Sequence, residues 1–205
     1  MSEDRASASA DLHYIRKILE QTQARIDPHA FHFVMWGTLV LIGYPLLNWL
    51  ELRERWSSML WIGVGALVLG AVLSAAFEIR LAGRPRLPAE NTFVARQVVL
   101  IVAANIGLGA LLSSAGPALG IVPEDRVSIV WGFLYANMAY MVGVVYMREY
   151  IVAGLAIATG TLIAWKVPDY SGFILGPFMG LGMIIPGVMA ERRVARLRRE
   201  SGGAA

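Results

Sequence analysis

Residues 31–50 read FHFVMWGTLVLIGYPLLNWL, twenty positions without a formally charged side chain. At about 1.5 Å of rise per residue, a helix of this length spans a hydrocarbon core of roughly 30 Å. A helix on the surface of a soluble domain has one apolar face, whereas this stretch is apolar on every side. The stretch therefore predicts a transmembrane helix.

The composition of the whole chain extends this prediction beyond one helix. Its 205 residues are 57% hydrophobic and 16% charged, whereas soluble domains are about 45–50% apolar and about 25% charged. Cysteine is absent, which excludes disulfides and cysteine-ligated metals. The formal net charge of +3 is too small to indicate nucleic-acid binding. We expect a polytopic membrane protein with no nucleic-acid partner and no cofactor.

Six apolar segments follow one another, so the predicted fold class is all-α, a bundle of about six transmembrane helices. A five-helix alternative stays open, because the fifth segment is short and joins the fourth tightly through Arg148 and Glu149. The segments cover residues 31–50, 59–79, 93–114, 127–147, 150–165 and 170–190.

The placement of basic residues predicts the orientation of the bundle. If the first residue is cytoplasmic and all six segments span, 14 of the 18 Lys and Arg residues fall on the cytoplasmic side. The positive-inside rule predicts such a bias. We therefore expect both termini in the cytoplasm, a transmembrane domain over 29–190 and a basic cytoplasmic tail over 191–205. The cluster between Arg192 and Arg199 should be drawn to anionic lipid.

The segment before the first membrane helix, residues 1–28, predicts an amphipathic cytoplasmic helix. Its apolar side chains recur at spacings of three and four, which places them on one face. This face can dock on the protein's own helices, lie on the membrane surface or bind a protein partner through residues 12–26. The stripe consists of Leu12, Ile15, Leu19, Thr22 and Ile26.

Two amides lie near the middle of predicted helices, Asn105 in the third segment and Asn137 in the fourth. An amide without a partner in hydrocarbon is costly, so each side chain should find one. Two interpretations stay open: a hydrogen bond that joins helices, or a polar lining for a ligand pocket or pathway. The side chains that can extend either arrangement are Tyr44, Asn48, Tyr135 and Tyr140.

The last segment contains Gly172, Gly176 and Gly180 at intervals of four, a doubled G-x-x-x-G pattern. Small residues on one helix face let another backbone approach closely. The partner of this face can be a helix of the same chain or of a second copy, so a homo-oligomer stays possible. We favour packing within the chain.

The pair Trp36-Gly37 in the first segment recurs as Trp131-Gly132 in the fourth. Three helices separate the two copies, so their orientations would be opposite. Inverted three-plus-three repeats build several transporter and channel folds. The match is short, and whether it marks a true duplication stays open.

Other ionisable residues give little sign of a catalytic or metal site. His29 and His32 are three apart, but no further ligand set accompanies them, so no metal site is predicted. Glu78 is expected at the membrane interface, paired with an arginine. The chain has no H-E-x-x-H, G-x-S-x-G or Walker motif, so we do not expect an enzyme.

The start of the chain carries one resemblance. Residues 12–23 read LHYIRKILEQTQ, with Tyr14, Ile15, Arg16 and Glu20 in the pattern Y-I-R-x-x-x-E. In this pattern, and in the tryptophan-glycine pair that follows, the chain resembles a loosely defined group of uncharacterised bacterial polytopic membrane proteins. The resemblance covers about the first 40 residues. It implies a bacterial inner-membrane protein and supplies no site residues.

Two functions follow as expectations. The first is a non-enzymatic interaction, sensor or regulatory protein of the bacterial cytoplasmic membrane, which contacts lipids and a cytoplasmic partner. The alternative is a small transporter or channel built on an inverted three-plus-three repeat, with Asn105 and Asn137 facing a pathway.

Overall fold

The computed structural model describes residues 30–82 and 92–202, and the regular structure in these two ranges is entirely helical. Each predicted segment forms one α-helix, with bounds within a few residues of those expected except at the end of the last, which extends to Gly202. The short 3-10 helices η2 (Glu124–Arg126) and η3 (Pro168–Tyr170) precede α5 and α7. The α-helices are α2 (Ala30–Glu51), α3 (Trp56–Ala82), α4 (Thr92–Ala115), α5 (Val127–Val145), α6 (Glu149–Lys166) and α7 (Ser171–Gly202). The expected amphipathic segment lies outside the described residues.

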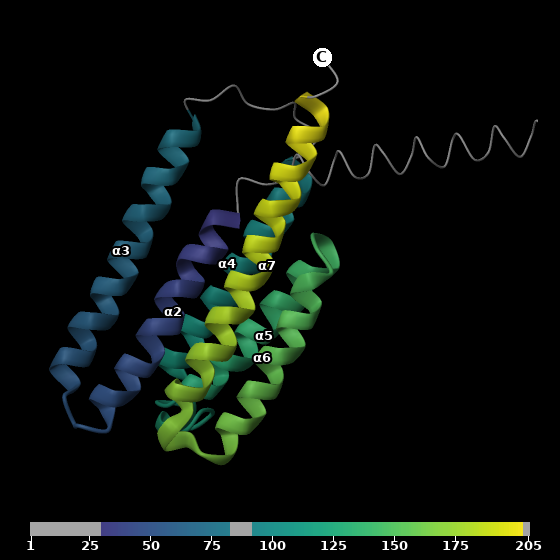
Figure 1. The fold of residues 1–205 in the computed structure, drawn as a ribbon. Coiled ribbons are helices and arrows are strands. Elements are labelled where there is room, and N and C mark those ends of the chain that lie inside the picture. Colours follow the sequence, from purple (N-terminus) through teal and green to yellow (C-terminus); the bar gives the residue numbers. More distant parts are fainter. Residues whose placement is uncertain (1–29, 83–91, 203–205) are drawn as a thin grey trace, which may run out of the picture.

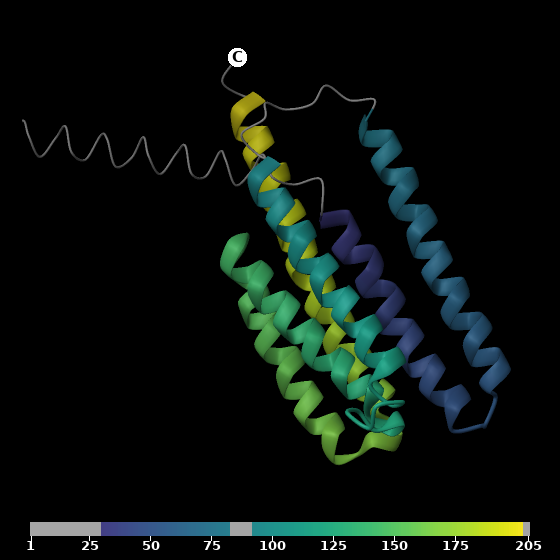
Figure 2. The same cartoon turned by 180° about the vertical axis from the view of Figure 1, so that it is seen from behind.

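Five of these helices, α2, α3, α4, α5 and α7, are long and apolar enough to cross a membrane. The sequence prediction of a membrane bundle is confirmed at this level. The sixth, α6, has 18 residues and carries Glu149 and Lys166 at its two ends. It packs between α5 and α7, so it stands within the bundle (Figures 1 and 2).

The helices pack in a simple order. α3 lies on α2, α2 on α7, α7 on α6, α6 on α5 and α5 on α4, and neighbours run antiparallel (Figures 1 and 2). α2 begins and α7 ends at the same end of the bundle, which we call the terminal end. The opposite end carries the turn over residues 116–123 and is called the loop end.

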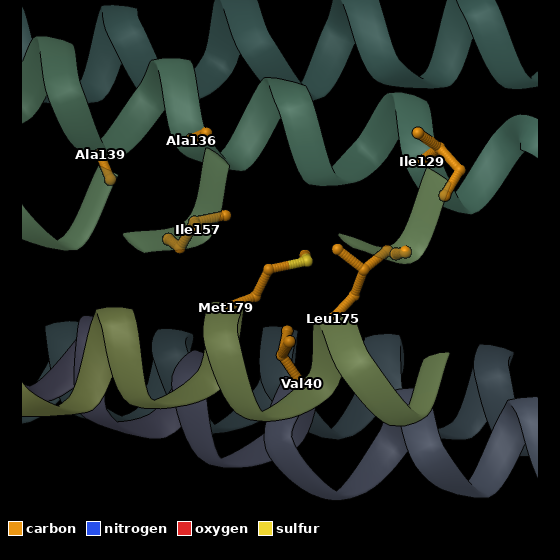
Figure 3. Packing of buried hydrophobic residues seen from close by; sticks show 8 residues of the cluster. Val40, Ile129, Ala136, Ala139, Ile157, Leu175 and Met179 are labelled. Atoms are coloured by element: carbon orange, nitrogen blue, oxygen red, sulfur yellow. The ribbon is translucent and has the colours of Figure 1, made fainter. Parts of the chain in front are cut away.

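The inner helices differ sharply from the outer two in burial. In the apolar 18-residue stretch of α7, 44% of the residues are buried. In the corresponding stretches of α4 and α3, 11% and 6% are buried. Figure 3 shows the centre of the bundle, where Ile129 of α5, Ile157 of α6 and two residues of α7, Leu175 and Met179, are almost completely buried. The core is therefore formed by α2, α5, α6 and α7.

The glycine stripe Gly172, Gly176 and Gly180 lies against α2. A Cβ atom on Gly176 would stand 2.6 Å from Cδ of Pro45, and one on Gly180 would stand 2.8 Å from the carbonyl oxygen of Gly37. These separations are shorter than van der Waals contact, so the two backbones approach closely only because side chains are absent. In this structure the stripe packs within the chain.

Candidate functional site

Asn48 of α2 is buried and binds the beginning of α7. Its Nδ2 donates to the carbonyl oxygen of Asp169 at 2.8 Å, and its Oδ1 accepts from the backbone N–H groups of Gly172 at 3.0 Å and Phe173 at 3.3 Å. The first N–H groups of a helix have no partner within that helix. Asn48 therefore caps α7 from another helix, and both the NH2 group and the carbonyl oxygen of its side-chain amide form hydrogen bonds.

Asn105 and Asn137 join α4 to α5. Nδ2 of Asn137 donates to Oδ1 of Asn105 at 3.0 Å, and Nδ2 of Asn105 donates to the carbonyl oxygen of Ile101 at 2.8 Å. The structure thus brings together the two amides that the sequence singled out. Their geometry is that of a hydrogen bond between helices.

The tyrosines are divided between the core and the surface. Tyr44 and Tyr135 pack against the central apolar cluster. The Tyr140 side chain is 45% exposed, on the outside of α5. The candidate residues therefore lie in three separate places. Asn48, Tyr44 and Tyr135 lie at the core, the amide pair lies between α4 and α5, and Tyr140 lies on the outside of α5.

A shallow opening of about 460 Å³ lies on the surface at the loop end, where the end of α4 meets the start of α5. Beside it, Nε1 of Trp131 donates to Oγ of Ser113 at 2.8 Å. The Trp131 ring also covers Gly109, one helical turn earlier on α4. The opening is lined by Ser113, Ser114, Pro117, Ala118, Glu124 and Val127, among which Glu124 is the charged side chain.

A different set of contacts joins α2 to α3 at the terminal end. Nε2 of His32 lies 2.9 Å from Oε1 of Glu78, and the rings of Phe31 and Phe77 stack with centroids 4.2 Å apart. Glu78 was expected to pair with an arginine, but the partner in the structure is a histidine. Among the described residues, no group of three or more metal-binding side chains is present.

The contact of Ser113 with Trp131 and the place of Glu124 in the lining of the opening were not predicted from the sequence. The two amides attracted attention because they lie near the middle of predicted helices, whereas Ser113 lies near the end of α4. A signal was present, because residues 108–115 around it repeat an earlier stretch of α3.

Comparison of the chain with protein-family models, curated proteins and solved structures gives no match.

Proposed function

We propose that the chain is a non-enzymatic protein of a bacterial cytoplasmic membrane that acts by association with anionic lipid and a cytoplasmic protein. The resemblance of its first 40 residues to bacterial membrane proteins agrees with this proposal. The terminal end of the bundle would face the cytoplasm, and the partner would bind residues 12–26.

The observation that carries the proposal is the difference in charge between the two ends. Among described side chains, the terminal end carries six basic and three acidic residues, whereas the loop end carries four basic and five acidic residues. Each basic residue near an anionic surface contributes about 1 kcal/mol to lipid attraction. The basic residues of the terminal end are Arg80, Arg96, Arg148, Arg192, Arg193 and Arg196.

Single-cysteine labelling tests the orientation directly, because the natural chain has no cysteine. With Arg196→Cys we expect labelling by a membrane-impermeant maleimide only after the cells are permeabilised. With Glu124→Cys we expect labelling of intact cells. The reverse pattern would reject the proposed orientation and, with it, the cytoplasmic role of the terminal end.

Purification from native membranes tests the association. Leu12→Asp combined with Ile15→Asp places two charges on the apolar stripe and should remove a partner mass seen by native mass spectrometry. Gln21→Asp is the matched control, since it adds a charge to the same segment outside the stripe. Equal partner masses in all three proteins would contradict the proposed binding segment.

A second candidate function, transport of a small cation, is favoured by the opening at the loop end. Its charged lining residue is the carboxylate Glu124, and Ser113 and Ser114 add hydroxyl groups. Uptake of tetraphenylphosphonium into proteoliposomes tests this candidate when it is measured in excess of the passive uptake into protein-free liposomes, because this lipophilic cation also crosses bare bilayers. We expect Glu124→Gln to reduce the excess uptake, and absence of any excess with the natural chain would reject transport of this class of ligand.

A further inference from the structure

Two stretches, one in α3 and one in α4, have nearly the same sequence. Residues 69–76 read LGAVLSAA and residues 108–115 read LGALLSSA, which are identical at six of eight positions. Each places a serine four residues after a glycine, so Gly70 and Ser74 share one helix face, as do Gly109 and Ser113. Each stretch also lies against a helix that carries a tryptophan-glycine pair.

The two tryptophans meet these glycines in the same way. Carbon atoms Cζ2, Cζ3 and Cη2 of Trp36 occupy the space where a side chain on Gly70 would lie. The same three atoms of Trp131 occupy that space at Gly109. We call each arrangement of tryptophan, glycine and serine a joint, one between α2 and α3 and the other between α5 and α4.

The order of packing makes the two joints equivalent. The main contacts follow the order α3, α2, α7, α6, α5, α4, in which α2 corresponds to α5, α3 to α4, and α7 to α6. α5 also contacts α7, and among the described residues α2 and α6 have no contact of similar extent. Corresponding helices run in opposite directions (Figures 1 and 2), so the α2/α3 joint lies toward the terminal end and the α5/α4 joint toward the loop end. Trp36 of α2 packs on α3, the next helix in the chain, whereas Trp131 of α5 packs on α4, the preceding helix. This correspondence therefore differs from the expected repeat, in which the first three helices would match the last three in the same order.

The joints differ in their hydrogen bonds. Ser113 accepts a hydrogen bond from Trp131, whereas Oγ of Ser74 is buried and has no partner among the described residues. A buried hydroxyl without a partner raises the free energy of the observed state relative to one in which the hydroxyl is bonded.

The two helix pairs also differ at the end nearest each joint, which is the terminal end for α2/α3 and the loop end for α5/α4. Aligned on the two repeats, His32 corresponds to Val127, and Glu78 corresponds to Pro117. His32 and Glu78 contact each other and close the α2/α3 pair, whereas Val127 and Pro117 line the opening of the α5/α4 pair. A side-chain contact therefore joins the end of the α2/α3 pair, whereas the end of the α5/α4 pair borders the opening.

We propose that the protein exchanges between this state and a mirrored state. In the mirrored state, Nε1 of Trp36 donates to Oγ of Ser74, His32 and Glu78 separate, and the α2/α3 pair opens at the terminal end as the α5/α4 pair closes. The proposal rests on the second candidate function, because an opening that alternates between the two ends gives a ligand access from each side in turn.

Pairs of spin labels measure the exchange without any ligand. Labels on Arg80→Cys and Arg148→Cys report the distance from α3 to the core at the terminal end. Labels on Leu111→Cys and Lys166→Cys report the distance from α4 to the core at the loop end. All four side chains are exposed. We expect two distance populations for each label pair, with the first pair moving apart as the second moves together.

Two serine variants should shift these populations in opposite directions. Ser113→Ala removes the bond of the observed state and should raise the mirrored population about three- to twenty-fold, the range for one hydrogen bond between membrane helices. Ser74→Ala should lower it by a similar factor. Thr159→Ala is the control, because its hydroxyl bonds to the Leu155 carbonyl of its own helix, α6, away from both joints and the opening. It should change neither population.

The outcomes separate the exchange from transport. Glu78→Gln should also raise the mirrored population, since it weakens the contact that closes α2/α3. A single unchanged distance in all variants, or a shift in the same direction for Ser74→Ala and Ser113→Ala, would overturn the exchange even if tetraphenylphosphonium is transported. Opposite shifts without uptake would support the exchange and reject only its use in transport of that cation.

Discussion

Replacement of Asn48 by leucine should destabilise the protein more than the same replacement of Asn137. Both amides lie in predicted membrane helices, yet they differ in their partners. Asn48 makes three hydrogen bonds to the start of α7, at 2.8, 3.0 and 3.3 Å. Asn137 donates one, at 3.0 Å, to Asn105, and its side chain is exposed. The two sites therefore provide a matched comparison.

The magnitude follows from the groups that lose a partner. Removal of a helix cap costs about 0.5–2 kcal/mol, and a further hydrogen bond between membrane helices contributes about 0.6 kcal/mol on average. Asn48→Leu removes the cap at Gly172 and Phe173 as well as the bond to Asp169, so the two contributions together give an expected loss of about 1–2.5 kcal/mol. Asn137→Leu removes one exposed bond, and we expect a loss of about 0.6 kcal/mol.

The assay is reversible unfolding in mixed micelles with increasing dodecyl sulfate, followed by circular dichroism. Asn48→Asp is informative beside Asn48→Leu, because a carboxylate still accepts from the N–H groups of α7 but cannot donate to Asp169. It should have intermediate stability. Equal losses for Asn48→Leu and Asn137→Leu, or a larger loss at Asn137, would refute the assignment of Asn48 as a cap.

Three further predictions concern the helix contacts. Gly180→Ala should destabilise the protein by about 1–3 kcal/mol, because its Cβ would overlap Leu41 and the backbone of Gly37. Gly63→Ala, where a Cβ meets open space, should be neutral or stabilising in the same unfolding titration. Ser113→Ala should cost about 0.6–2 kcal/mol by the loss of its bond to Trp131, whereas Ser74→Ala should cost little, and equal losses would contradict the different bonding of the two serines. Asn105→Ala and Asn137→Ala should be coupled by about 0.6 kcal/mol in a double-mutant cycle, and strict additivity would argue against their direct bond.

The helices could be predicted from the sequence because transmembrane segments are recognisable by their length and apolar composition. A helix that crosses a bilayer needs about twenty apolar residues, and this requirement is independent of its neighbours. The five-helix alternative depended on the 150–165 segment, and in the described residues α6 is the α-helix that is not among the five long and apolar enough to cross a membrane. Its charged ends, Glu149 and Lys166, shorten its apolar stretch while its packing keeps it in the bundle.

The pairing of helices could not be derived in the same way. Hydropathy does not state which apolar faces meet, since lipid and protein interiors are similarly apolar. The glycine stripe on α7 indicated close packing but not that its partner would be α2. The sequence left Asn48 open between a bond that joins helices and a polar lining, because its donors, the N–H groups at the start of α7, lie more than 120 positions away in the chain. A cap supplied across that distance has no local sequence signature.

The distribution of contacts indicates which helices can move. α2 and α7 meet through backbone atoms at Gly37 and Gly180, and a shift there would open a gap that lipid cannot fill well. In the described part of the chain, α3 packs mainly on α2 and most of its surface is exposed, so lipid can replace many of its neighbours at little cost. A helix held mainly by a few specific contacts changes position when those contacts change. α3 and α4 are helices of this kind, and they carry the glycines of the two joints, Gly70 and Gly109. We therefore assign the conformational exchange to α3 and α4 and treat the four inner helices as a fixed frame.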